Sequence, residues 1–186
     1  EVEARWNLVE TAWNLNMNPN LLNLEFDIDG DFFFTKNYKM KRIDVSSARD
    51  SLNGYQKGKC FYCFTDISII KGNNNIGHVD HFFPHINKSY HKADINGIWN
   101  LVLSCSTCNG QSEKGTKIPN LDPYLIRLNK RNNFFIDSHH PLRETLINQT
   151  GKTEKERNIF LNEQDKIAIN CSIIRWKISP KSKAMF

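Results

Sequence analysis

Two pairs of cysteines constrain this chain more than any other feature of its sequence. Each pair has the spacing Cys-x2-Cys, at Cys60 and Cys63 and at Cys105 and Cys108, and 41 residues lie between the two pairs. Four thiolates brought together in this way form the closed tetrahedral cage that structural zinc prefers. The sequence therefore predicts a Zn²⁺ site made by these four residues. We expect the ion to supply much of the folding energy, because such a cage exists only in the folded state.

Two other interpretations of the cysteines fit the chain less well. Disulfides need an oxidising compartment and would leave one of the five cysteines, Cys171, unpaired. A redox-active Cys-x2-Cys pair normally occurs singly and within a thioredoxin-like pattern, which this chain lacks. We expect Cys171 to pack on the buried face of a C-terminal helix instead of reacting.

The composition is that of a globular protein with a core. Of the 186 residues, 39% are hydrophobic and 24% are charged, and no apolar run approaches the ~18 residues that cross a bilayer. The chain opens without the pattern of a signal peptide, and reduced cysteine pairs favour a reducing compartment. These features predict a cytoplasmic protein with no role for a membrane.

Charge is divided unevenly along the chain. Residues 1–35 hold seven acidic residues and one basic residue, a net charge of −6, which leaves 24 basic and 13 acidic residues, a net charge of +11, for the rest. A basic surface of this kind favours a polyanionic partner such as nucleic acid. We take Arg127, Lys130 and Arg131 as candidate nucleic-acid contacts, because they lie close together on one predicted helix.

The pattern divides the chain into three parts. Residues 1–45 predict an acidic helix followed by a β-hairpin around Asp29-Gly30, a pair of residues that suits a tight turn. This part is expected to serve packing or docking. Residues 46–120 contain both cysteine pairs and begin with a helix that Ser46 or Ser47 would cap.

The third part, residues 121–186, predicts a basic helical extension. A first helix starts at Asp122-Pro123, and a second one opens at Pro141. Thr153-Glu-Lys-Glu156 has the residues of a capping box and predicts a third helix that reaches Ile178.

A short segment between the cysteine pairs has the residues of a hydrolytic site. It reads Val79-Asp80-His81-Phe82-Phe83-Pro84, and Trp99-Asn100-Leu101 and Cys108-Asn109 follow downstream. Taken together, these motifs resemble the HNH endonucleases, in particular the zinc-stapled subset whose ββα-metal core lies between two Cys-x2-Cys knuckles. The resemblance covers residues 54–117, about a third of the chain.

The resemblance implies an α+β fold in which a four-cysteine zinc site staples a ββα-metal HNH core. It implies that His81 is the general base, that Asp80 and Asn109 ligate a catalytic Mg²⁺ or Mn²⁺, and that Asn100 braces the loop that aims His81. The chemistry is consistent with these roles: a neutral imidazole can take a proton from water near pH 7, and oxygen ligands favour hard cations.

The chain departs from the family at two positions. Asn109 stands where many members have histidine, which shifts the preference of the site away from metals that favour nitrogen ligands. The family commonly has a lysine three positions later, whereas the first lysine here is Lys114, five positions after Asn109. A two-residue insertion could still deliver Lys114 to the phosphate, so it is counted among the candidate catalytic residues.

These features predict an enzyme that hydrolyses DNA phosphodiester bonds, by double-strand cleavage or by nicking. We expect it to be the nuclease module of a larger restriction or anti-phage defence protein or complex, with RNA as an alternative substrate. The competing hypothesis is a zinc-stabilised nucleic-acid-binding module without catalysis. In that case Asp80 and His81 merely form hydrogen bonds within the fold.

Overall fold

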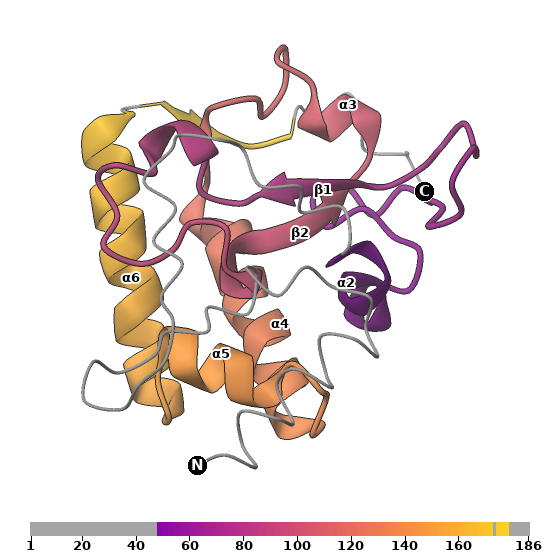
Figure 1. The fold of residues 1–186 in the computed structure, drawn as a ribbon. Helices are drawn as coiled ribbons and strands as arrows, with labels where there is room; N and C mark the ends of the chain where they lie inside the picture. The colour runs from indigo at the N-terminus through magenta and orange to yellow at the C-terminus, as the bar shows by residue number, and fades with distance from the viewer. Residues whose placement is uncertain (1–47, 173, 179–186) are drawn as a thin grey trace, which may run out of the picture.

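The computed structural model describes residues 48–172 and 174–178, which form an α+β fold with two small sheets (Figure 1). The helix and hairpin predicted in residues 1–45, and the capping residues Ser46 and Ser47, lie outside the described residues. No helix within the described part of the chain has the length and apolar character needed to cross a membrane.

The elements follow one another along the chain as α2 (Arg49–Gln56), β1 (His78–His81), the 3-10 helices η3 (His85–Asn87) and η4 (Ile98–Asn100), β2 (Leu101–Ser104), α3 (Ser106–Asn109), β3 (Ile118–Pro119), a π-helical turn η5 (Leu121–Leu125), α4 (Ile126–Asp137), α5 (Arg143–Thr150), α6 (Glu154–Cys171) and β4 (Arg175–Trp176). Helix α2 starts without a side-chain cap.

The strands β1 and β2 form an antiparallel pair at the centre of the fold. Asp80 lies opposite Val102 and His81 lies opposite Leu101. All four residues of β2 are buried, as expected for the apolar run Leu-Val-Leu when both of its faces are covered. This pairing places the candidate site at the end of β1, where the chain enters the long connection to β2.

The backbone of β2 is also bonded on the side away from β1. The side chain of Gln56, at the end of α2, donates to the carbonyl of Leu103 and accepts from its amide, both at 2.8 Å. The amide of Phe61 donates to the same carbonyl at 2.8 Å. The helix α2 and the first cysteine pair are therefore both attached to β2 at one residue.

The helices α4, α5 and α6 pack below and beside the β1–β2 pair (Figure 1). The core of the fold is built from large apolar side chains that are at most 1% exposed, among them Phe82, Phe83, Trp99, Leu128, Phe135 and Leu146. Because β1 and β2 have four residues each, and a hairpin alone is marginally stable in water, this helical layer is what makes the sheet stable.

The predicted C-terminal helix forms but is shorter than expected. The capping box is present, with Thr153 accepting from the Glu156 amide and the Glu156 carboxylate accepting from the Thr153 amide. The helix α6 ends at Cys171, so the prediction that it reaches Ile178 was wrong. The chain leaves the helix because the following residues form β4, which pairs in parallel with β3.

Cys171 is exposed, which corrects the prediction that it lies in the core. The buried face of α6 runs through Leu161, Asp165 and Ala168, and burial ends before Cys171, the last residue of the helix. The carboxylate of Asp165 is paired with Arg175 of β4 at 2.5 and 2.7 Å, so the polar side chain on the buried face is neutralised by the strand that follows the helix.

The other two predicted helices also form, the first of them later than expected. Asp122 has an extended backbone, and the regular helix α4 starts at Ile126 instead of at Asp122-Pro123. The helix α5 starts at Arg143, two residues after Pro141, and ends before Gly151.

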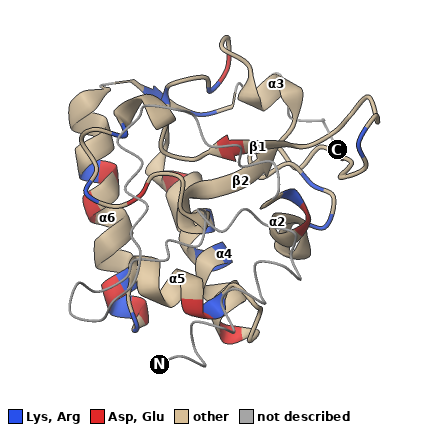
Figure 2. Ribbon diagram, in the orientation of Figure 1, with Lys and Arg blue, Asp and Glu red and all other residues tan. Residues whose placement is uncertain are grey.

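Arg131, predicted to contact nucleic acid, is buried in this structure. The basic residues of α4 are visible in Figure 2, but Arg131 is 1% exposed and its guanidinium donates to the carbonyls of Ile98 and Trp99 at 3.2 and 3.1 Å. Burial lowers the pKa of Arg131 to about 9. Its contacts tie α4 to η4, and its charge is not presented on the surface.

We predict that Arg131→Ala lowers the free energy of unfolding by about 2–4 kcal/mol, because it removes charge-assisted hydrogen bonds and leaves a cavity and unpaired carbonyls. Urea unfolding monitored by circular dichroism measures the change. Lys130→Ala, one position earlier on the exposed side of α4, is the control and should change stability by no more than about 0.5 kcal/mol. Equal, small effects of both substitutions would contradict the structural role of Arg131.

Candidate functional site

The four cysteines that the sequence predicts to bind zinc come together in the structure. The sulfur atoms of Cys60, Cys63, Cys105 and Cys108 all lie within 4.8 Å of one another, and those of Cys63 and Cys105 are 3.7 Å apart. A tetrahedral site with Zn–S bonds of about 2.3 Å places its sulfur atoms about 3.8 Å apart. The cluster therefore has the donor atoms and the spacing to hold a metal ion such as zinc.

Local backbone geometry prepares these sulfur atoms for a metal. Cys105 caps the single helical turn α3, and its sulfur accepts from the amide of Cys108 at 3.4 Å. The sulfur of Cys60 accepts from the amide of Cys105 at 3.3 Å. A hydrogen bond from Cys108 lowers the pKa of Cys60 to about 5, and the same bond raises the pKa of Cys108. One thiolate is thus favoured before any metal binds, and metal binding releases the remaining protons.

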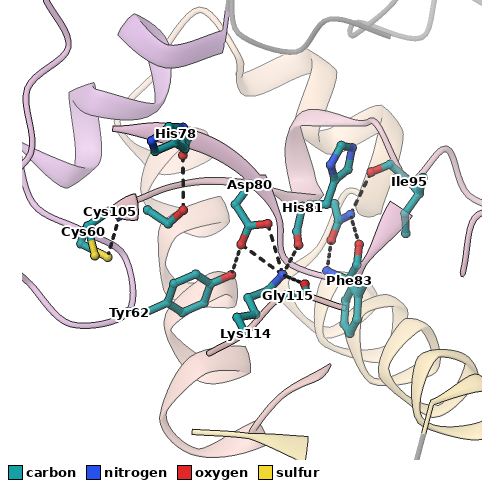
Figure 3. Close-up of polar contacts among 12 residues, drawn as sticks. Cys60, Tyr62, His78, Asp80, His81, Phe83, Ile95, Cys105, Lys114 and Gly115 are labelled. Carbon is teal, nitrogen blue, oxygen red and sulfur yellow. Dashed lines mark hydrogen bonds and ion pairs between the residues drawn. The ribbon is translucent and has the colours of Figure 1, made fainter. Parts of the chain in front are cut away.

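The first cysteine knuckle reaches the candidate catalytic residues through Tyr62. Its hydroxyl donates to Oδ2 of Asp80 at 2.8 Å (Figure 3), and its ring meets the stacked rings of Tyr124 and Trp176 edge to face. Burial, together with the charge of Asp80, raises the pKa of Tyr62 well above its ordinary value. The hydroxyl therefore keeps its proton and fixes the orientation of the carboxylate.

Lys114 lies against Asp80. Its ammonium is 3.2 Å from Oδ1 and 3.1 Å from Oδ2 of Asp80, and it donates to the carbonyl of His81 at 2.8 Å (Figure 3). The lysine is 1% exposed. The insertion after Asn109 thus does bring Lys114 to the candidate site, but its ammonium contacts the carboxylate expected to ligate a metal.

His81 is held as a neutral base. Its Nε2 is 2.9 Å from Oδ1 of Asn96, and because an amide oxygen can only accept, Nε2 carries the proton and Nδ1 carries the lone pair. Burial lowers the pKa of His81 to about 4, and the bond to Asn96 and the charge of Asp80 offset this only in part. The ring of His85 lies 5.4 Å from the ring of His81.

Asn100 ties together two parts of the connection that follows His81, at Phe83 and at Ile95. It is fully buried; its Oδ1 accepts from the amide of Phe83 at 2.8 Å, and its Nδ2 donates to the carbonyls of Phe83 and Ile95 at 3.0 and 2.8 Å. Because these bonds use both ends of a buried side chain, Asn100 cannot contact a substrate, and it acts by positioning the backbone around Phe83 and Ile95.

Four of the predicted site residues line one cleft of about 470 Å³. The polar residues around it include Asp80, His81, His85, Asn109, Gln111 and Lys114. Asp80 and His81 come from the end of β1, Asn109 from the end of α3, and Lys114 from the turns that follow α3. The cleft therefore combines a neutral imidazole, a carboxylate, an amide and an ammonium.

Tyr62, Asn96, His85 and Gln111 belong to this site but were not predicted from the sequence. Tyr62 could have been predicted from its position between Cys60 and Cys63, because a side chain inside a Cys-x2-Cys knuckle lies close to the segment on which the knuckle packs. Asn96 had none, since it lies in an irregular loop between η3 and η4. Comparison of the chain with known protein families, curated proteins and solved structures finds no match.

Loss of the metal ion from the four-cysteine site is expected to unfold the protein. We predict that Cys108→Ala, or a strong chelator, removes bound zinc and abolishes cooperative thermal unfolding, because structural thiolate sites supply folding energy. Zinc content by elemental analysis and thermal circular dichroism check this. Cys171→Ala is the matched control: this cysteine is exposed and its removal should leave zinc content and stability unchanged. A Cys108 variant that retains full stability would argue against a structural metal.

Proposed function

We propose that this protein is a metal-dependent HNH endonuclease that hydrolyses DNA phosphodiester bonds. The observation that carries the proposal is the single cleft lined by Asp80, His81, Asn109 and Lys114, connected through Tyr62 to the four-cysteine cluster. The net charge of +11 outside residues 1–35 supports a polyanionic substrate. We place the chain as the nuclease module of a larger assembly, for instance a restriction or anti-phage system.

His81 acts as the general base in this proposal. Its imidazole is neutral at pH 7 because burial lowers its pKa to about 4, so a lone pair is available for a proton from water. The water oxygen then forms a bond to phosphorus while the bond from phosphorus to the 3′ oxygen breaks. Asn100 contributes by holding the backbone that follows His81, which keeps the imidazole at the wall of the cleft.

The carboxylate of Asp80 and the amide oxygen of Asn109 suit a hard cation such as Mg²⁺ or Mn²⁺. Such an ion, when bound, neutralises charge on the phosphate and on the departing oxygen. Lys114 contacts both oxygens of Asp80, so an ion that binds this carboxylate competes with the ammonium, and we expect the ion to displace it. Once released, Lys114 is free to contact a phosphate of the substrate.

We predict that His81→Ala lowers cleavage of plasmid DNA by a factor of about 10²–10⁴ while DNA binding persists, because the variant loses its base but none of its basic surface. Plasmid relaxation with Mg²⁺ or Mn²⁺, against a control without added divalent metal, measures cleavage, and fluorescence anisotropy measures binding. His139→Ala, at an exposed position, should cleave as the unaltered protein does.

The alternative outcomes are distinct. If the unaltered protein cuts neither plasmid nor structured RNA with any divalent metal but still binds DNA, the zinc-stabilised binding module replaces the nuclease. If it cuts only RNA, the reaction stands and the substrate changes.

Lys114→Met tests whether the ammonium and a metal compete for Asp80. The variant leaves a buried carboxylate without its partner, so we predict a loss of stability of about 3–5 kcal/mol when no Mn²⁺ is added. We also predict a gain in Mn²⁺ affinity of about 5- to 150-fold, because the competing cation is gone, together with slower cleavage. Calorimetric titration with Mn²⁺ and thermal unfolding with and without the ion measure both. Asp80→Asn should lose Mn²⁺ binding, and weaker Mn²⁺ binding by Lys114→Met would refute the competition.

A further inference from the structure

A second hollow on the protein has features of a binding site that the cleavage chemistry does not use. It measures about 650 Å³ and shares no lining residue with the cleft at Asp80. It lies between the end of α2, the first cysteine knuckle and the start of α4. The residues that matter for its chemistry are Lys57, Phe61, Phe64, Ile126, Arg127 and Lys130.

Phe64, directly after the first knuckle, has an unfavourable backbone conformation. Its φ of 64° lies in the left-handed region, which glycine occupies freely and which crowds the Cβ of any bulky residue. With Phe64 in this conformation the backbone closes the knuckle: the Phe64 amide donates to the carbonyl of Cys60 at 3.0 Å, and the Cys60 amide donates to the carbonyl of Thr65 at 2.9 Å. Burial does not compensate for the strain, since the side chain is 58% exposed. An exposed aromatic ring kept at a strained position points to a function for that ring.

The ring of Phe64 is part of a fixed platform. The guanidinium carbon of Arg127 lies over this ring, 4.2 Å from its centre, within the range of a cation–π contact. Arg127 is itself held in place, because it donates to the carbonyls of Phe61 and Tyr62 in the knuckle. The guanidinium covers one face of a ring that is still 58% exposed, so a nucleic-acid base would stack on the opposite face.

The charge around this platform favours a polyanion. Four basic residues and one acidic residue, Asp122, line the hollow. Of the basic residues, Lys59 is paired with Asp66 at 2.6 Å, whereas Lys57 and Lys130 are exposed at the rim. An acidic peptide would satisfy these charges but would not need the exposed face of Phe64, so the combination favours nucleic acid over a protein partner.

We propose that this hollow binds a single-stranded stretch of nucleic acid, with one base stacked on Phe64 and the flanking phosphates on Lys57 and Lys130. The inference rests on the proposed function and narrows its substrate to nucleic acid with unpaired bases, such as a bubble, an overhang or a single strand. Bases within a duplex cannot use the platform, because their faces are covered by their neighbours in the stack.

Phe64→Gly tests the proposal because stability and binding should change differently. Glycine accepts the left-handed backbone without strain, so the midpoint of thermal unfolding should stay the same or rise. The affinity for a fluorescein-labelled oligo-dT should fall about 5- to 100-fold, the share of one stacked base. The affinity for a duplex of equal length should change by less than about twofold. All binding is measured by fluorescence anisotropy without added Mg²⁺ or Mn²⁺, so that no cleavage occurs, with the zinc content checked for each variant.

Further variants separate stacking from general effects. Phe64→Trp keeps an aromatic face and should bind oligo-dT within about threefold of the unaltered protein, whereas Phe64→Asn, which tolerates the same backbone, should lose affinity as glycine does. Lys130→Ala should weaken binding and lower the salt slope by about one. Ile159→Ala, at an exposed apolar position on α6, is the control and should bind normally.

The proposal falls if Phe64→Gly and Phe64→Asn bind oligo-dT as tightly as the unaltered protein, or if they lose duplex binding to the same extent. Because these measurements involve no cleavage, their outcome is separate from that of the nuclease assay. Cleavage with no effect of Phe64 would leave the nuclease and remove this site, and Phe64-dependent binding without cleavage would do the reverse.

Discussion

The convergence of four sulfur atoms is the constraint on which the rest of this structure depends. It joins the segment after α2 to the end of β2, although 41 residues separate the two cysteine pairs. The first knuckle then serves two surfaces, because Tyr62 points from it to Asp80 while Phe64 lines the second hollow. The strands β1 and β2 have only four residues each. A bound metal would therefore hold both surfaces in place without the need for a larger sheet.

The second organising interaction is the buried pair of Asp80 and Lys114. A carboxylate with so little exposure requires a compensating charge, and in this structure an ammonium supplies it while Tyr62 adds a hydrogen bond. In this arrangement the positive charge of Lys114 neutralises the negative charge of Asp80. A cation that binds Asp80 competes with the ammonium of Lys114, so its affinity for this carboxylate reflects a difference between two interactions and not one new contact.

The sequence predicted the parts of the fold that depend on local chemistry. The two Cys-x2-Cys pairs predicted the four-cysteine cluster, because each pair is a local signal and metal chemistry requires four such ligands to meet. The capping-box residues predicted the start of α6, because that signal lies within four residues. Asp80 and His81 lie at the end of a strand, as their segment predicts, and Asn109 and Lys114 line the cleft with them. The HNH fold and the catalytic roles of these residues stay predictions.

The errors concern properties that depend on distant parts of the chain. Arg131 was expected on the surface because arginine is seldom fully buried, yet the carbonyls of η4 accept its hydrogen bonds. The end of α6 is set by pairing between β3 and β4, whose paired residues are 57 positions apart in the sequence. The ammonium of Lys114 was expected at a substrate phosphate, and nothing in its neighbours along the chain indicates that it contacts Asp80.

The bonds between Gln56 and Leu103 have a consequence for how this protein can meet others. A strand at the border of a sheet normally offers its amides and carbonyls to any extended chain, which invites aggregation or docking by strand addition. At Leu103 both groups are already taken by a glutamine amide that imitates a neighbouring backbone. At this residue of β2 an added strand would find neither a free amide nor a free carbonyl, so Gln56 protects this part of the border from uncontrolled pairing.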